Sequence, residues 1–186
     1  MICRSKVSAR LVVLALALSF AACGKPAEDR ARAAELQRTQ AAIGAYSAAS
    51  QAANSLHSDV IGAFQRANRS TSLPDYRDAM QKDVLPAMDR FIERLSQMPT
   101  GTPELERIHG GLVQAYRDAR SKLATYTESL QTARDLARFA PIREELQQRV
   151  AAYRSDLDNY YRGHNRQLRL EGGAAGMAAE ATPAAP

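Results

Sequence analysis

The chain has 186 residues, of which 45% are hydrophobic and 24% are charged, and its formal net charge is +5. These values predict one domain of modest size and argue against a wholly disordered chain. Arg4, Lys6 and Arg10 precede an apolar run that we expect to be removed; subtracting these three from the 25 basic residues leaves 22, against 20 acidic residues. A nucleic-acid binder needs a clustered basic face, so no nucleic-acid partner is expected.

Residues 1–22 have the pattern of a signal peptide that is removed from the mature protein. The basic residues precede an apolar run at 11–20, which is too short to span about 30 Å of hydrocarbon at 1.5 Å per residue. The run ends in the segment Ser19-Phe20-Ala21-Ala22-Cys23. This segment resembles the lipobox of bacterial lipoprotein precursors. The alternative is an ordinary signal peptide with an incidental cysteine.

The lipobox resemblance implies a covalent lipid on Cys23, which would become the mature N-terminus. Diacylglycerol would be attached to the thiol and an acyl chain such as palmitate to the amino group. Each buried methylene contributes about 0.8 kcal/mol, so several chains anchor a protein to a membrane far more firmly than one. Gly24, rather than Asp, follows the cysteine, and by the same resemblance this favours the periplasmic side of the cell outer membrane over the inner membrane. The other cysteine, Cys3, lies in the leader, so the mature chain can form no internal disulfide.

The body of the chain is rich in Ala, Leu, Arg, Gln and Glu, which favours helix throughout. We expect a lipidated N-terminus and short linker at 23–27, a helical domain at 28–171, and a disordered tail rich in Ala, Gly and Pro at 172–186. Apolar residues recur at steps of three and four, and prolines and glycines divide the pattern. The predicted helices are about 28–69, 74–98, 102–139 and 141–171.

Prolines mark the expected breaks between and within these helices. Pro74 and Pro103 suit a first helical turn, where the missing N–H would have no partner. Pro86 lies inside the second helix and predicts a kink near 82–86. The pair Ala140-Pro141 is taken as the last chain reversal.

The third predicted helix carries the longest stripe. Its inward positions are Leu105, Ile108, Leu112, Tyr116, Ala119, Leu123, Tyr126, Leu130, Ala133 and Ala137. The first two predicted helices carry similar stripes, which include Tyr46 on the first and Met80 on the second.

Four helices with short loops predict an all-α fold, an antiparallel up-down-up-down four-helix bundle with an extended first helix. A three-helix or extended coiled-coil arrangement is the competing architecture. Residues 24–40 hold little apolar bulk and are interpreted as a spacer between bilayer and bundle. Four pairs spaced i,i+4 are expected to be ordinary surface ion pairs: Asp78/Lys82, Asp118/Lys122, Glu145/Arg149 and Asp158/Arg162.

Candidate chemistry is sparse, because the sequence contains no phosphate-binding loop, zinc motif or nucleophile elbow. Counting from the loops places His57 and His164 on neighbouring helices at nearly the same level, with Tyr116 in the same layer. Such a layer could bind a metal, a haem or a small ligand, or form a histidine pair sensitive to pH. The structural alternative is that isolated histidines at stripe edges are hydrogen-bonded or face solvent. The third histidine, His109, has no assigned role.

The leading functional hypothesis is a non-enzymatic lipoprotein that presents a helical binding or scaffolding module, with an envelope protein as partner. No catalytic residue, no metal and no cofactor other than the lipid on Cys23 are expected. A ligand-binding bundle that uses His57, His164 and Tyr116 is the first alternative. A periplasmic inhibitor or immunity lipoprotein is the second.

Overall fold

A computed structural model describes residues 24–164, and the chain divides into two compact units, residues 1–40 and 41–186. The described part of the first unit belongs to helix α2 (Gly24–Asn68), so helix begins inside the segment 23–27 that was expected to be a linker. Residues 27–38 are all exposed, including Leu36 at 54%. Ala, Arg, Glu and Gln are strong helix formers, which explains helix without a buried face.

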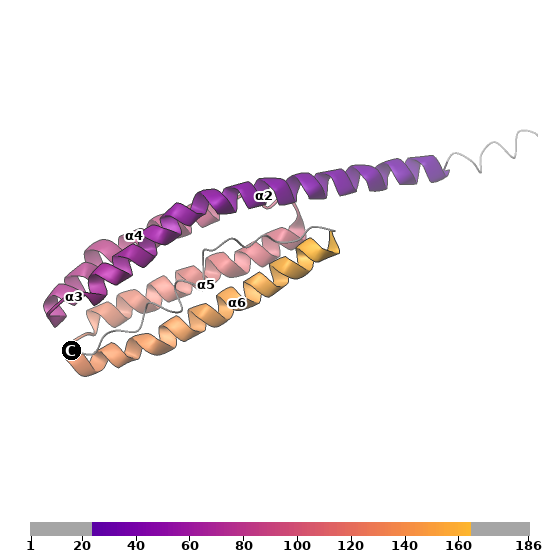
Figure 1. Cartoon of the computed structure of the whole chain (residues 1–186). Coiled ribbons are helices and arrows are strands. Elements are labelled where there is room, and N and C mark those ends of the chain that lie inside the picture. Colours follow the sequence, from indigo (N-terminus) through magenta and orange to yellow (C-terminus); the bar gives the residue numbers. More distant parts are fainter. Residues whose placement is uncertain (1–23, 165–186) are drawn as a thin grey trace, which may run out of the picture. The chain divides into compact units, whose positions relative to one another are not determined.

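The second unit is all-α, as predicted, and its described residues contain no strand (Figure 1). After the C-terminal part of α2 come α3 (Leu73–Ala79), the π-helical turn η1 (Met80–Val84), α4 (Leu85–Ser96), α5 (Pro103–Glu128), the 3-10 helix η2 (Ala133–Arg138) and α6 (Phe139–Gly163).

Contacts within the second unit show that successive helices run in opposite directions. On α5 and α6, Lys122 pairs with Glu145 and Asp118 with Arg149, so rising numbers on one helix meet falling numbers on the other. The same reversal appears between α4 and α5 and between α2 and α6. The contacts that show it are Asp89 with Arg120, Leu95 with His109, Tyr46 with Tyr153, and Phe64 with Phe139.

Capping residues set two of the helix starts where the sequence predicts them. The side chain of Ser72 accepts from the backbone N–H of Asp75 at 3.2 Å, and that of Thr102 accepts from Leu105 at 3.2 Å. Gly101, in the loop before α5, has φ +68°, and a Cβ there would lie 2.6 Å from the Cβ of Ala42. Glycine is therefore needed for both the backbone conformation and the close approach of this loop to α2.

The expected disturbance near Pro86 takes the form of a π-helical turn. The N–H of Leu85 bonds to the carbonyl of Met80, five residues back. Pro86 has no N–H, and its ring would crowd the carbonyl four residues back in a regular helix. The wider turn accommodates the proline, and the chain continues directly into α4.

The predicted end of the third helix, residue 139, is wrong. Helix α5 ends at Glu128, and the chain reverses ten residues before Ala140-Pro141. The carboxylate of Asp135 accepts from the backbone N–H groups of Gln131 and Thr132, at 3.1 and 2.8 Å, and starts a new helical segment. Pro141 instead sits in the first turn of α6, where its missing N–H costs little.

This correction also changes the fourth predicted helix, 141–171. Helix α6 starts at Phe139 and ends at Gly163. The remainder of the predicted helix, from residue 165, and the predicted tail at 172–186 lie outside the described residues.

The predicted apolar stripes form the core of the second unit. Of the ten inward positions expected on the third helix, those from Leu105 to Leu130 are buried, whereas Ala133 and Ala137, beyond the new break, are exposed. Tyr46, Met80, Leu105 and Leu130 are among the largest fully buried side chains. The bundle is therefore held together mainly by apolar burial along the stripes.

Candidate functional site

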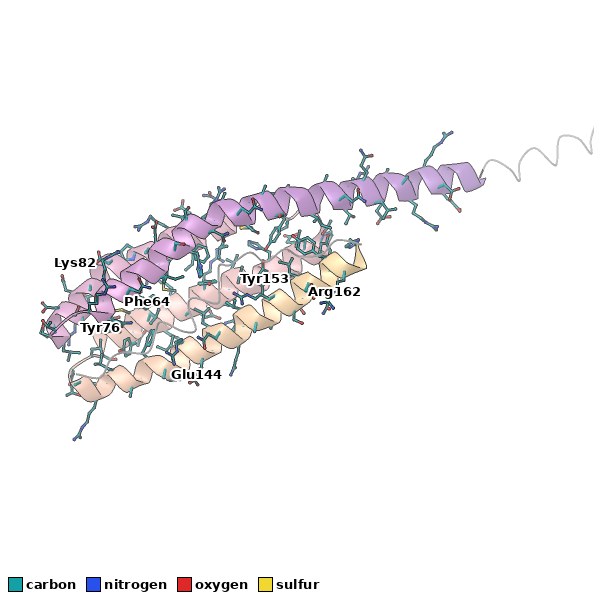
Figure 2. The ribbon with its side chains drawn as sticks, in the orientation of Figure 1. Phe64, Tyr76, Lys82, Glu144, Tyr153 and Arg162 are labelled. Carbon is teal, nitrogen blue, oxygen red and sulfur yellow. The ribbon has the colours of Figure 1, made fainter. Side chains whose placement is uncertain are left out.

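A buried hydrogen-bonded chain of side chains crosses the second unit near the loop between α4 and α5. The hydroxyl of Tyr46, on α2, lies 2.8 Å from Nδ1 of His109 and 2.7 Å from the hydroxyl of Tyr153. The other ring nitrogen of His109, Nε2, lies 2.7 Å from the backbone carbonyl of Leu95. Tyr153, labelled in Figure 2, belongs to α6, so the chain joins α2, α4, α5 and α6.

Burial lowers the pKa of His109, and with the imidazole neutral the chemistry of these partners fixes the direction of each hydrogen bond. The carbonyl of Leu95 can only accept, so Nε2 of His109 carries the hydrogen and donates. Nδ1 is then the acceptor and receives the hydroxyl proton of Tyr46. The oxygen of Tyr46 therefore accepts from Tyr153, which makes Tyr153 the first donor of the chain.

Burial keeps the network neutral. Tyr46 is fully buried and His109 is 5% exposed. Burial lowers the pKa of His109, and the bond to Leu95 partly offsets that shift. Burial also raises the pKa of Tyr46, and the neighbouring Tyr153 raises it further. Because both nitrogens of His109 and the hydroxyl of Tyr46 are used, the network stabilises the packing of four helices.

Two of the predicted site residues, His57 and Tyr116, do lie together. Their ring centroids are 6.5 Å apart with the planes nearly perpendicular, and Phe91 lies 5.3 Å from His57 and 4.9 Å from Tyr116. Burial lowers the pKa of His57, and the charge of Arg154 lowers it further. Burial raises the pKa of Tyr116 to about 12. This layer is an aromatic cluster built around a neutral, buried imidazole.

The third predicted member, His164, does not join them, so the expected layer is wrong in this respect. His164 follows α6 and packs against Tyr160, with ring centroids 4.7 Å apart. The hydroxyl of Tyr160 bonds to Thr102 at the start of α5, at 2.9 Å. Asp118 faces Arg149, so the level of Tyr116 on the antiparallel α6 is near residue 151, and 13 further residues to His164 amount to about 20 Å of helix.

The core also holds a small apolar cavity of about 40 Å³ between α2, α4, α5 and α6. Its lining includes Val60, Met88, Tyr116, Leu123 and Leu146. A space of this size has room for about one water molecule, but an apolar wall offers water few partners.

No group of three or more His, Cys, Asp or Glu side chains within residues 24–164 is arranged to hold a metal ion. In the same part of the chain, no helix is long and apolar enough to cross a membrane. Cys23, the predicted lipid-attachment residue, lies outside the described residues.

Sequence reasoning missed the pairing of Tyr46 with His109. One signal was available: Tyr46 lies on a predicted inward stripe, and a buried phenol needs a hydrogen-bond partner. His109 follows Ile108 on the third helix, at the edge of its stripe. Which tyrosine meets which histidine depends on the register between helices, and that register is not contained in either stripe.

Neither protein-family models, nor curated proteins, nor solved structures give a match to this chain.

Proposed function

We propose that this protein is a lipid-anchored envelope protein whose helical bundle acts without bond-making chemistry, as a binding or scaffolding module. The lipobox resemblance at Ser19 to Cys23 is the observation that carries the proposal. Acyl chains on Cys23 would hold the mature N-terminus in the bilayer. With Gly24 after the cysteine, the periplasmic side of the outer membrane is the proposed location.

The described residues next to the proposed anchor support a spacer role. Helix α2 begins at Gly24, and residues 27–38 expose their side chains. The first buried side chain along the chain is that of Ile43 among residues whose burial is described. At 1.5 Å per residue, the helical segment 24–40 is about 25 Å long. A segment of this length and polarity suits a tether between an anchored cysteine and a folded module.

The construction of the bundle supports a role that depends on a fixed surface. Four helices share the buried chain from Tyr153 through Tyr46 and His109 to Leu95. Salt bridges between Lys122 and Glu145 and between Asp118 and Arg149 add a second set of links between α5 and α6. A satisfied polar network of this kind holds one arrangement of helices, which a partner can recognise repeatedly.

Metabolic labelling with a palmitate analogue tests the anchor, and the chain supplies its own matched control. We expect label on the wild-type protein and on Cys3→Ser, because Cys3 lies in the leader, and no label on Cys23→Ser. Equal labelling of Cys23→Ser, or loss of label from Cys3→Ser alone, would contradict the proposal.

A further inference from the structure

A polar groove lies on the second unit between α2 and the π-helical turn. Its volume is about 430 Å³, and Ser58, Asp59, Gly62 and Arg66 of α2 line it together with Lys82, Asp83, Ala87 and Arg90 of η1 and α4. Lys82 is labelled in Figure 2. The groove shares no residue with the buried network or with the aromatic cluster around His57.

The charged side chains of this groove face a common space without pairing. Within residues 24–164, Arg66 and Arg90 form no ion pair, and neither do Asp59 and Asp83. Lys82 is the exception, because its ammonium group lies 2.6 Å from Asp78. Elsewhere on the bundle, exposed Asp89 and Arg120 pair at 2.8 Å, whereas these four groove residues remain available to a ligand.

We propose that this groove binds a small zwitterion that carries a phosphate group beside an ammonium group. Two guanidinium groups supply forked N–H donors, which match the oxygens of a phosphate. The carboxylates of Asp59 and Asp83 would repel a bare phosphate, but they would accept from a neighbouring ammonium. A ligand with both charges therefore fits the groove better than either charge alone.

The shape of the groove agrees with this assignment. Gly62 contributes no side chain and Ala87 only a methyl group, so the space between the charged side chains stays open. A Cβ placed on Gly62 would lie 3.5 Å from Nη1 of Arg66, which shows that the guanidinium group folds back over the glycine. The π-helical turn places Lys82 and Asp83 at the rim of the same space.

Calorimetric titration of the full chain, purified in a mild non-ionic detergent at pH 7.5, tests the proposal. Phosphoethanolamine is the main probe, with inorganic phosphate and ethanolamine as probes of each charge alone. We expect saturable binding of phosphoethanolamine, at least about tenfold tighter than that of either single-charge probe. No saturable binding of phosphoethanolamine, or equal binding of inorganic phosphate, would overturn the proposal.

Variants distinguish ligand binding by the groove residues from nonspecific attraction by the net charge of the protein. Arg66→Gln and Arg90→Gln should each weaken phosphoethanolamine binding by about tenfold or more, since each removes charged hydrogen bonds. Arg107→Gln makes the same change in net charge on an exposed residue of α5 outside the groove, and should leave binding unchanged. Equal weakening by Arg107→Gln would show that only net charge matters and would overturn the proposal.

Two further variants test the two carboxylates and the open space beside Gly62. The double variant Asp59→Asn/Asp83→Asn should remove the preference for phosphoethanolamine over inorganic phosphate while binding of phosphate persists. Gly62→Met keeps every charge, suits a helix and fills the groove, so it should also weaken binding. Unchanged preference in the first variant, or unchanged affinity in the second, would contradict the assigned geometry.

A last pair of probes identifies the source of the ligand. Glycerophosphoethanolamine is a phosphodiester like a lipid headgroup, whereas phosphoethanolamine is a monoester like a soluble metabolite. Tighter binding of the diester assigns a lipid headgroup and tighter binding of the monoester assigns a free metabolite, and both results support the site. This proposal depends on the groove residues alone and holds whether or not Cys23 carries lipid.

Discussion

Replacing Tyr46 by Phe removes one oxygen from the centre of the buried chain of hydrogen bonds. Nδ1 of His109 then becomes a buried acceptor without a partner, and Tyr153 loses the group to which it donates. An unsatisfied buried polar group costs about 1–3 kcal/mol, so with the lost bonds we expect Tyr46→Phe to lower the free energy of unfolding by about 2–4 kcal/mol.

The proton directions predict a much smaller effect for Tyr153→Phe. Tyr46 still donates to His109 in that variant, and the oxygen of Tyr46 loses only an incoming bond. Tyr153 is also half-buried, whereas Tyr46 is fully buried. The loss should be about 0.5–1.5 kcal/mol, the net value of a single hydrogen bond.

Urea unfolding of the full chain in mild detergent, followed by circular dichroism at pH 8, measures both values. Tyr160→Phe is the matched control, because Tyr160 is buried and has one hydrogen bond, at 2.9 Å to Thr102. The expected order of destabilisation is Tyr46→Phe first, with Tyr153→Phe and Tyr160→Phe similar and smaller. Equal effects of Tyr46→Phe and Tyr153→Phe would refute the assigned proton directions.

Four more outcomes follow from the structure, all read from the free energy of unfolding. Burial lowers the pKa of His57 and His109, so the unfolded chain takes up protons before the folded chain does as the pH falls below about 6.5. The free energy of unfolding should therefore be constant above pH 7.5. Below pH 6.5 it should decline by up to about 1.4 kcal/mol per pH unit for each histidine. A rise in stability over the same range would contradict this assignment. Gly101→Ala should cost at least about 1–2 kcal/mol, because φ is +68° and the new Cβ would meet Ala42 at 2.6 Å. Thr132→Ala should cost about 0.5–2 kcal/mol through loss of the cap at η2, and no loss would count against the capping explanation of the break after α5. Leu36→Gln, on the exposed part of α2, should change stability by less than about 0.5 kcal/mol, and a larger loss would show that this side chain is packed in the native protein.

The parts of the fold that sequence predicted well are those set by local pattern. Stripes at three and four residue spacing identified the inward faces, including Tyr46, Met80 and Leu105 among the fully buried residues. Prolines and caps near Ser72 and Thr102 located two helix starts. Each of these features depends on a few neighbouring residues, so no knowledge of the other helices is needed.

The third helix shows where local pattern fails. The apolar spacing continues through Leu130, Ala133 and Ala137, so it predicts that the helix continues there. The capping residues Thr132 and Asp135 prevail because they satisfy backbone N–H groups at a new helix start, and the two alanines bury too little surface to compete. The last chain reversal therefore lies ten residues earlier than predicted. Each residue of the fourth helix consequently lies at a different level of the bundle from the predicted one.

The different position of the last reversal explains why two of the three predicted site residues meet and the third does not. His57 and Tyr116 lie on either side of loops that were placed correctly, and they meet. His164 was placed by counting from Pro141, and it lies at the end of α6 beside Tyr160. The ion pairs show the same effect: Asp118 and Glu145 pair across α5 and α6, with Arg149 and Lys122, instead of along their own helices. Pairing between helices depends on register, which no single helix encodes.

Intact mass spectrometry of the protein extracted from membranes tests the central proposal most directly. The proposal predicts a mature chain that begins at Cys23 and carries the added mass of a diacylglycerol group, with or without a further amide-linked acyl chain. A mature chain that begins at another residue, or one that begins at Cys23 without added mass, would contradict it.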